Sequence, residues 1–171
     1  MNRADILVAG IGNIFLGDDA FGVEVVRRLA ARPIPEGVHV QDFGIRGFDL
    51  AFALDSANTI ILVDAASRGD APGTLYTIEP DLDNLDSTPD RLDAHAMDPV
   101  QVLRLAKQMN VVPGRILVVG CEPATLGPEN EGVMGLSPPV EEAVGRAVEL
   151  IESMIARRHA GETAPASGAR V

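Results

Sequence analysis

The chain has few of the residues on which several common kinds of functional site depend. Its 171 residues include one cysteine, no tryptophan and only 4% aromatic residues. A single cysteine excludes both a disulfide framework and a cysteine-based zinc site within one chain. Basic residues are also scarce, with 14 Lys and Arg against 25 Asp and Glu. The resulting net charge of −11 argues against a nucleic-acid partner.

Long apolar runs are missing as well. No segment approaches the roughly 20 apolar residues of a membrane-spanning helix, and the N-terminus lacks the apolar stretch of a signal peptide. We therefore expect no membrane partner and a cytoplasmic location. Apolar residues still make up 46% of the chain, which is enough for one domain with a real core. We expect that domain to span residues 1–160, and residues 161–171 to form a disordered tail.

Short aliphatic segments alternate with segments of helical periodicity along the chain. The strands that we expect cover residues 3–9, 38–42, 59–63, 74–78 and 116–119. Helices are expected over residues 19–31 and 48–57. Two further helices are expected after Asp98 and Ser137, which we expect to be their N-caps, each with a proline at the first helical turn. This alternation predicts an α/β fold, a three-layer sandwich with a mainly parallel sheet between helices. The segment 74–78 is a candidate edge strand, and the one candidate for an antiparallel strand.

The chain is organised around residues 7–22, where an aliphatic strand leads into a glycine-punctuated loop and then a helix. Gly12 and Gly17 have the spacing of a phosphate-binding P-loop, but Asp18 and Asp19 stand where Lys and Ser or Thr are required. Two carboxylates at a helix N-terminus repel a further anion, so a nucleotide site is the weaker interpretation. One of the two acids is expected only to cap the helix.

Three acids stand at the ends of the first three expected strands or in the loop that follows: Asp19, Asp42 and Asp64. The carboxyl ends of parallel strands meet at one edge of a sheet, where ligands bind. His95 precedes a helix that should begin near the same edge. Each residue alone is better explained by an ordinary structural role, but their predicted convergence favours a metal site. Two carboxylates and an imidazole suit nickel, zinc or iron and do not distinguish among them.

Other catalytic arrangements fit the sequence poorly. It contains no G-x-S-x-G nucleophile elbow and no H-E-x-x-H zinc helix. Cys121 follows the expected strand 116–119, but no histidine lies near it in the sequence to support a nucleophile. We expect Cys121 to be a small buried side chain.

Several short motifs occur in a fixed order between about residues 5 and 155. They are Gly10-Ile11-Gly12-Asn13 with Asp18-Asp19, then Asp64-Ala65, then His95 before a helix, and Gly135 to Val140 before the last helix. Together they resemble the maturation endopeptidases of nickel-iron hydrogenases. The resemblance implies a twisted five-stranded sheet flanked by helices. It also implies an aspartic-type endopeptidase that removes a short C-terminal extension from the precursor of a nickel-iron hydrogenase large subunit after nickel insertion.

The same resemblance implies roles for individual residues. Asp19, Asp64 and His95 would be the catalytic residues and would contact the nickel. The nickel would be presented by the substrate, already bound to the substrate's own thiolates, rather than held as a permanent cofactor. The residues that would help to engage the substrate are Asp42, Gly44 and Asn13.

Two other functions are compatible with the same residues. One is a metallochaperone or assembly factor that binds metal without hydrolysis. The other is a metallohydrolase of a small molecule, in which the acid-rich segment 79–94 could serve as a lid. A change in the size of a precursor protein would separate the endopeptidase from both.

Overall fold

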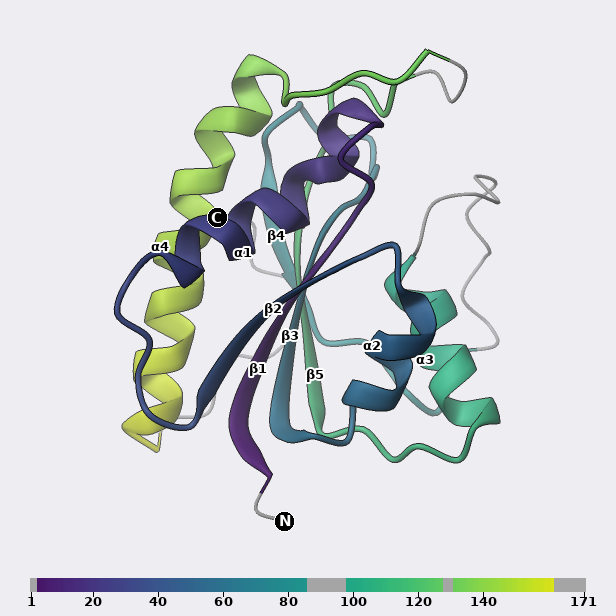
Figure 1. Ribbon diagram of the computed structural model, residues 1–171, viewed down its shortest axis with the longest axis vertical. Helices are drawn as coiled ribbons and strands as arrows, with labels where there is room; N and C mark the ends of the chain where they lie inside the picture. Colours follow the sequence, from purple (N-terminus) through teal and green to yellow (C-terminus); the bar gives the residue numbers. More distant parts are fainter. Residues whose placement is uncertain (1–2, 86–97, 128–130, 162–171) are drawn as a thin grey trace.

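The computed structural model describes residues 3–85, 98–127 and 131–161. These residues form a five-stranded sheet in the order β2-β1-β3-β5-β4, with helices on both faces (Figure 1). Strands β1, β2, β3 and β5 are mutually parallel, and β4 runs antiparallel to β5 at the edge. The predicted fold class and the antiparallel edge strand are therefore confirmed. The strands are β1 (Ala4–Ile11), β2 (Val38–Gly44), β3 (Ala57–Ala65), β4 (Leu75–Ile78) and β5 (Arg115–Cys121).

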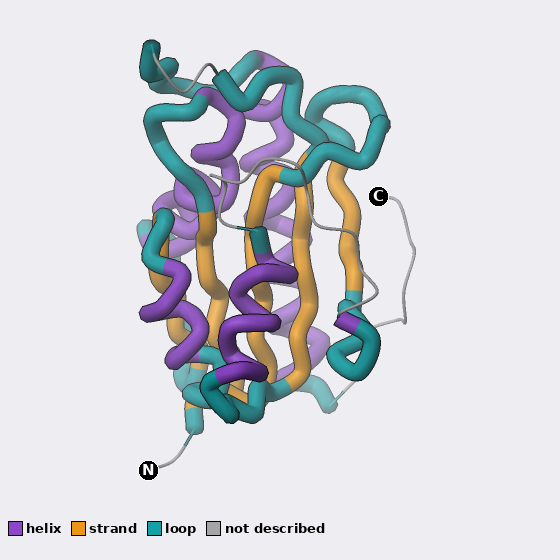
Figure 2. Tube along the Cα trace, turned by 90° about the vertical axis from the view of Figure 1, so that its right-hand side faces the viewer, coloured by secondary structure: helices purple, strands orange, loops and turns teal. Residues whose placement is uncertain are grey.

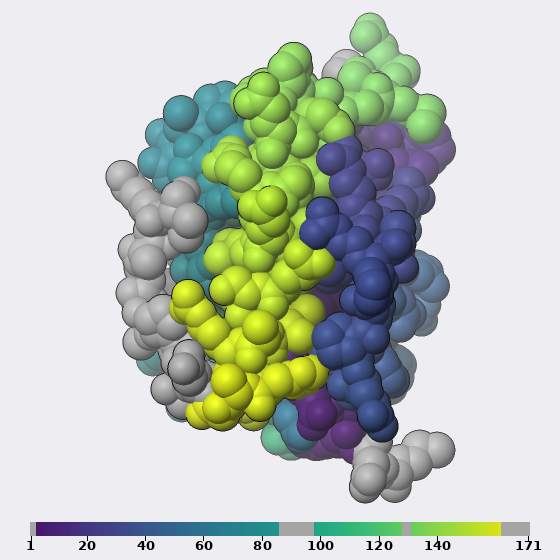
Figure 3. Space-filling view, turned by 90° about the vertical axis from the view of Figure 1, so that its left-hand side faces the viewer, coloured from purple at the N-terminus to yellow at the C-terminus, as the bar shows by residue number. Residues whose placement is uncertain are grey.

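Among the described residues, two α-helices cover each face of the sheet. Helices α1 (Phe21–Ala30) and α4 (Pro138–His159) lie side by side on one face (Figure 3). Helices α2 (Gly47–Ala53) and α3 (Pro99–Gln108) contact each other on the opposite face (Figures 1 and 2). A short 3-10 turn, η1 (Gly17–Ala20), precedes α1. Because each face of the sheet is covered, the central strands are apolar on both sides.

Residues in the central strand β3 alternate between two cores. Ile61 and Val63 pack with α1 and α4, whereas Ile60 and Leu62 pack with α2 and α3. Successive strand residues point to opposite faces. Asp64 follows Val63 and therefore lies on the face that α2 and α3 cover.

Several element boundaries differ from the expected ones. β3 continues through Asp64 to Ala65, because Asp64 pairs with Gly120 and Ala65 with Cys121 of β5. The pairing partner thus extends the strand by two residues beyond its apolar run. The expected helix over 19–31 begins only at Phe21, because residues 17–20 form the tighter 3-10 turn. The expected helix over 48–57 ends at Ala53, since Ala57 already pairs with Ala4 in the sheet.

Some expectations concern parts of the chain that the structure describes incompletely. The expected tail over 161–171 lies outside the described residues except for Gly161, and the domain extent of 1–160 stays a prediction. The acid-rich segment 79–94 is described only as far as residue 85. Within the described ranges, no helix combines the length and the apolar character that crossing a bilayer requires.

Candidate functional site

Glycines allow the turn before α1 to lie directly on the carboxyl ends of β1 and β3. A Cβ atom added at Gly22 would lie 2.0 Å from the Val63 carbonyl oxygen, and one at Gly12 would lie 1.8 Å from the Asp19 carbonyl oxygen. Only a residue without a Cβ fits at such distances. The glycines around Asp19 therefore serve close packing. This packing brings the segment that carries Asp19 to the same edge of the sheet as Asp64.

Asp19 is almost fully buried, at 5% exposure, and its carboxylate is oriented by the loop before it. The backbone N–H of Asn13 donates a hydrogen bond of 2.7 Å to Asp19 Oδ2. The Asn13 side-chain oxygen in turn accepts a hydrogen bond of 2.9 Å from the backbone N–H of Phe15. Asn13 thus builds the turn that positions Asp19, while its predicted substrate contact stays a prediction.

Asp64 is the second buried carboxylate at this edge, at 2% exposure. It lies in β3 directly opposite Gly120 of β5. η1, the turn that carries Asp19, contacts β3. Burial of a carboxylate costs several kcal/mol unless hydrogen bonds or a cation compensate. Two such carboxylates from separate segments at one ligand-binding edge are the arrangement that a cation would favour.

Asp42 reaches the same edge but is directed to the other side of the sheet. It pairs with Gly10 of β1, and its carboxylate lies 3.6 Å from the guanidinium of Arg27 on α1. Asp64 instead lies on the face of α2 and α3. The predicted convergence at one edge is therefore found for Asp19, Asp42 and Asp64, but Asp42 lies on a different face from Asp64.

Gly44 ends β2 in the left-handed conformation, with φ of 54°, which favours glycine. Its carbonyl oxygen accepts a hydrogen bond of 3.0 Å from the backbone N–H of Gly12. A register shift in the pairing of β1 with β2 accommodates Phe43, which is buried. The turn at Gly44 is thus bound to the loop that carries Asn13, next to Asp19.

The third predicted metal ligand, His95, lies outside the described residues. Close to it in the sequence, Asp98 caps α3 by accepting a hydrogen bond of 2.9 Å from the backbone N–H of Val100, as predicted. In residues 3–85, 98–127 and 131–161, no group of three or more His, Cys, Asp or Glu side chains gathers as a metal site. The complete ligand set of Asp19, Asp64 and His95 stays a prediction.

Asp18 has a structural role that sequence reasoning missed. It is fully buried, and its carboxylate ties the β5–α4 loop to η1. Oδ2 accepts hydrogen bonds from the backbone N–H groups of Ala124 (2.8 Å) and Thr125 (3.1 Å). Ser137 donates both its N–H to Oδ1 (2.7 Å) and its hydroxyl to Oδ2 (2.8 Å). Because these donors lie more than 100 residues away, no local pattern could reveal them.

The predictions that Asp18 or Asp19 caps the first helix and that Ser137 caps α4 are therefore wrong. Neither η1 nor α1 has a side-chain hydrogen bond from its N-cap residue. Ser137 stands at the N-cap of α4 without capping it, because its hydroxyl is engaged by Asp18. Long-range hydrogen bonds have replaced the local ones that the sequence suggested.

Cys121 is the small buried side chain that the sequence predicts, at 0% exposure. Burial raises the pKa of its thiol from 9.0 to about 12.

We expect no reaction of the native protein's Cys121 with an aromatic disulfide reagent at pH 8, and full reaction after unfolding in guanidinium. Since the folded-state pKa is the higher one, this group stabilises the fold fully below pH 9 and progressively less as pH rises toward 12. Rapid native-state reaction at pH 8 would contradict the burial.

Comparison with known protein families identifies the family to which this chain belongs. The family model described as hydrogenase maturation protease matches residues 23–154. The chain belongs to the hydrogenase maturation protease family. The predicted resemblance and the predicted enzyme class, a peptidase, are thereby confirmed.

Individual relatives of this maturation protease agree. It is 32% identical to the hydrogenase 2 maturation protease of Escherichia coli (strain K12), over 85% of this chain and 87% of that protein. It is 34% identical to the hydrogenase expression/formation protein HupM of Azotobacter chroococcum mcd 1, over 90% of this chain and 73% of HupM. With the hydrogenase expression/formation protein HupD of Rhodobacter capsulatus, the 34% identical match covers 71% of this chain but only 58% of HupD.

Solved structures share the fold of this maturation protease. The hydrogenase maturating endopeptidase HybD from E. coli aligns with a TM-score of 0.74 at 31% identity, covering 92% of this chain and 94% of HybD. The hydrogenase 2 maturation peptidase from Thaumarchaeota archaeon SCGC_AB-539-E09 aligns with a TM-score of 0.68 at 32% identity, covering 89% of this chain and 98% of that one. The protein is therefore an endopeptidase of the maturation type, as its sequence predicts.

Proposed function

We propose that this maturation protease removes a C-terminal extension from the precursor of a nickel-iron hydrogenase large subunit, after nickel has been inserted. The observation that carries the proposal is the pair of buried carboxylates, Asp19 and Asp64, held by separate segments at one edge of the sheet. The relatives named as hydrogenase maturation proteases support the choice of substrate.

The nickel belongs to the substrate in this proposal. Asp19 and Asp64, together with His95 on the basis of the sequence alone, would complete the coordination of a nickel ion that the precursor already holds by its thiolates. Carboxylate and imidazole ligands suit a divalent transition ion. A nickel cation between Asp19 and Asp64 would add a favourable electrostatic interaction with both carboxylates. Binding would then depend on the metal, and cleavage would act as a checkpoint for its insertion.

Asp42, Gly44 and Asn13 would engage the chain of the precursor beside this metal contact. Gly44 is joined to the Gly12–Asn13 loop by a backbone hydrogen bond, so the two loops form one continuous rim. Asp42 lies beside this rim, on the face of the sheet that α1 covers. Its pairing with Arg27 at 3.6 Å is long and partly exposed, which leaves the carboxylate available to a substrate.

The two alternative functions are less well supported. Relatives named as maturation proteases favour hydrolysis of a protein over metal carriage or small-molecule hydrolysis. The aspartic type of the mechanism, the nickel contact and the cytoplasmic location stay predictions.

The proposed activity is tested by incubating the purified protein with a cognate, nickel-loaded large-subunit precursor and measuring intact masses. We expect the precursor to lose one C-terminal peptide, whose mass identifies the cleaved bond. Precursor incubated alone is the control for self-cleavage. An unchanged mass of a loaded, cognate precursor would contradict the proposed function and favour a non-hydrolytic assembly factor.

A further inference from the structure

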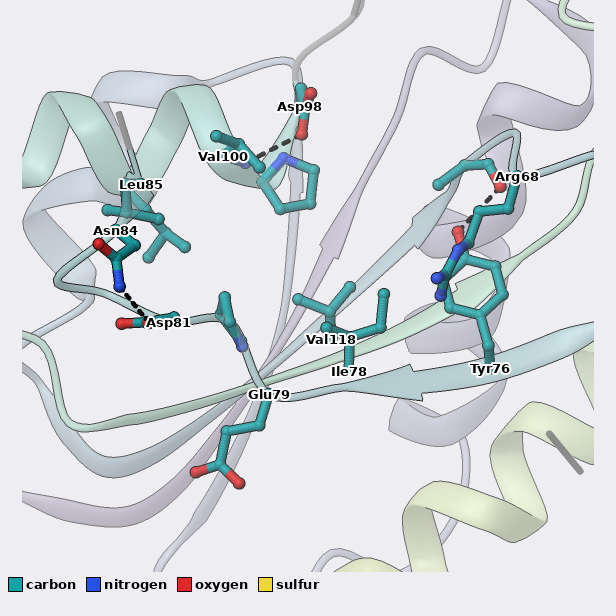
Figure 4. Close-up of a pocket in the computed structure, with 14 residues that line it drawn as sticks. Arg68, Tyr76, Ile78, Glu79, Asp81, Asn84, Leu85, Asp98, Val100 and Val118 are labelled. Carbon is teal, nitrogen blue, oxygen red and sulfur yellow. Dashed lines mark hydrogen bonds between the residues drawn. The ribbon is translucent and has the colours of Figure 1, made fainter. Parts of the chain in front are cut away.

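A cavity of about 460 Å³ lies on the α2/α3 face of the sheet, between β4, β5 and the first turns of α3 (Figure 4). This volume falls in the range of small ligand-binding pockets. The cavity is lined mainly by apolar side chains, and Figure 4 shows Ile78 and Val118 together on its sheet side. The large apolar and aromatic residues of the lining are Tyr76, Ile78, Leu85, Val100, Leu103 and Val118.

The register of the sheet places this cavity next to Asp64. Asp64 of β3 is opposite Gly120 of β5, and Gly120 is opposite Tyr76 of β4. Directly opposite residues in neighbouring strands point to the same face, so this row shares the face of the cavity. Ile78 and Val118 form the adjacent row of the same face. The cavity therefore begins beside the row that contains Asp64.

Gly120 shapes the end of the cavity that is nearest to Asp64. A Cβ atom at position 120 would lie 2.2 Å from atoms of the Tyr76 ring, so the ring occupies the space that a side chain at this position would need. The Tyr76 hydroxyl donates a hydrogen bond of 2.8 Å to the Ala66 carbonyl oxygen, which fixes the ring. This end of the cavity is thus a rigid aromatic wall.

The acids of the cavity lining are already engaged by neighbouring groups. Glu79 forms two hydrogen bonds with Arg115, of 2.7 and 2.8 Å, and this partner lowers the pKa of Glu79. Figure 4 shows the Glu79 carboxylate pointing away from Val118. Asp81 accepts a hydrogen bond of 2.6 Å from the Asn84 side chain, and Asp98 caps α3.

Arg68 is a positively charged residue of the cavity lining. Its guanidinium lies 4.8 Å from the centroid of the Tyr76 ring, and its backbone N–H donates a hydrogen bond of 2.6 Å to Glu122. Within the part of the chain that the structure describes, the guanidinium makes no ion pair. In a protein of net charge −11, the cavity thus presents an available positive charge beside an apolar interior.

We propose that this cavity is a specificity pocket that binds an apolar side chain of the precursor's C-terminal segment, with a neighbouring carboxylate of the substrate at Arg68. The proposal rests on the proposed proteolytic function. Two strand spacings of about 4.8 Å separate Asp64 from the cavity, and an extended peptide advances about 3.3 Å per residue. The bound side chain is therefore about three residues from the scissile bond.

Binding of the apolar side chain is tested with Ile78→Trp, because the larger indole would fill the cavity from β4. The kcat/KM for cleavage is measured on the nickel-loaded precursor and on precursors with single alanine substitutions within four residues of the cut. For the wild-type protease, we expect alanine at one apolar position to lower kcat/KM by roughly 10- to 200-fold. Ile78→Trp should lose a similar factor on the unchanged precursor and become insensitive to alanine at that position.

The contact between Arg68 and a substrate carboxylate is tested with Arg68→Glu. The matched control is Arg157→Glu, on the last turn of α4. We expect Arg68→Glu to raise KM about tenfold or more with little change in kcat, and Arg157→Glu to change neither. The substrate's acidic residues are then replaced with Lys one at a time, and each precursor is incubated with Arg68→Glu. If one replacement restores cleavage, the carboxylate of that side chain is the partner of Arg68. If none restores it, and amidation of the precursor's C-terminus prevents cleavage by the wild-type protease, the partner is the terminal carboxylate.

These outcomes separate the pocket from the proposed function. If the wild-type protease does not cut the precursor, the proposed function has failed. If it cuts, but Ile78→Trp and Arg68→Glu match it on every precursor, only the pocket is contradicted. Thermal melting verifies that each variant is folded, and Ile78→Phe repeats the test with a smaller change if Ile78→Trp is unstable.

Discussion

Replacing Asp64 with Asn is expected to abolish processing of the nickel-loaded precursor, with a fall in kcat/KM on the order of 10³-fold. Asn has nearly the same shape, so the buried site, which is 2% exposed, is not left with a cavity. The change removes the negative charge that favours a metal cation. A single-turnover assay read by intact mass measures the loss, and thermal melting shows whether the fold is kept.

Asp19→Asn is expected to behave like Asp64→Asn, because both carboxylates are proposed to contact the same substrate nickel. The matched control is Asp49→Asn on α2, whose acidic side chain is 61% exposed. It should leave processing unchanged. His95→Ala tests the third predicted ligand and should also abolish processing. Near wild-type rates for both Asp19→Asn and Asp64→Asn would contradict the metal contact.

Asp18→Ala is expected to lower the free energy of unfolding by about 4 kcal/mol. Asp18 accepts four hydrogen bonds from the β5–α4 loop, and hydrogen bonds to charged groups contribute about 1.5–3 kcal/mol each, without adding fully. The substitution leaves the three backbone N–H donors without their acceptor. For a chain of this length, 4 kcal/mol corresponds to a fall in Tm of roughly 8–16 °C.

Ser137→Ala is the graded control for this prediction. It removes only the hydroxyl donor to Asp18 and keeps the backbone hydrogen bond. We expect a loss of about 1 kcal/mol. Differential scanning calorimetry or urea unfolding measures both variants. A Tm for Asp18→Ala within 2 °C of wild type would contradict the role of Asp18 as the anchor of this loop.

The adjacent acids Asp18 and Asp19 show that the sequence predicts the position of a residue better than its role. Their position after a strand and a glycine loop places both at the carboxyl edge, and the structure confirms that placement. The sequence does not separate their roles. Asp18 faces the β5–α4 loop, whereas Asp19 accepts the Asn13 N–H. That separation depends on contacts between segments more than 100 residues apart, which no local pattern encodes.

The strand ends illustrate a related limit. Apolar runs locate the strands, but pairing with a neighbour sets their ends, so β3 continues through Asp64 to Ala65. The faces of the edge acids depend on the same pairing. Alternation along β2 directs Asp42 toward α1, while alternation along β3 directs Asp64 toward α2 and α3. Convergence at one edge was predictable from parallel strands, whereas the face of each acid required the observed strand bounds and register.

The most direct test of the metal-dependent checkpoint compares nickel-loaded and nickel-free forms of one precursor, each incubated with the wild-type protease and with Asp64→Asn. We expect the wild-type protease to release the C-terminal peptide from the loaded form only, and Asp64→Asn to release it from neither. Equal cleavage of both forms by the wild-type protease would contradict recognition of the substrate's nickel through Asp19 and Asp64.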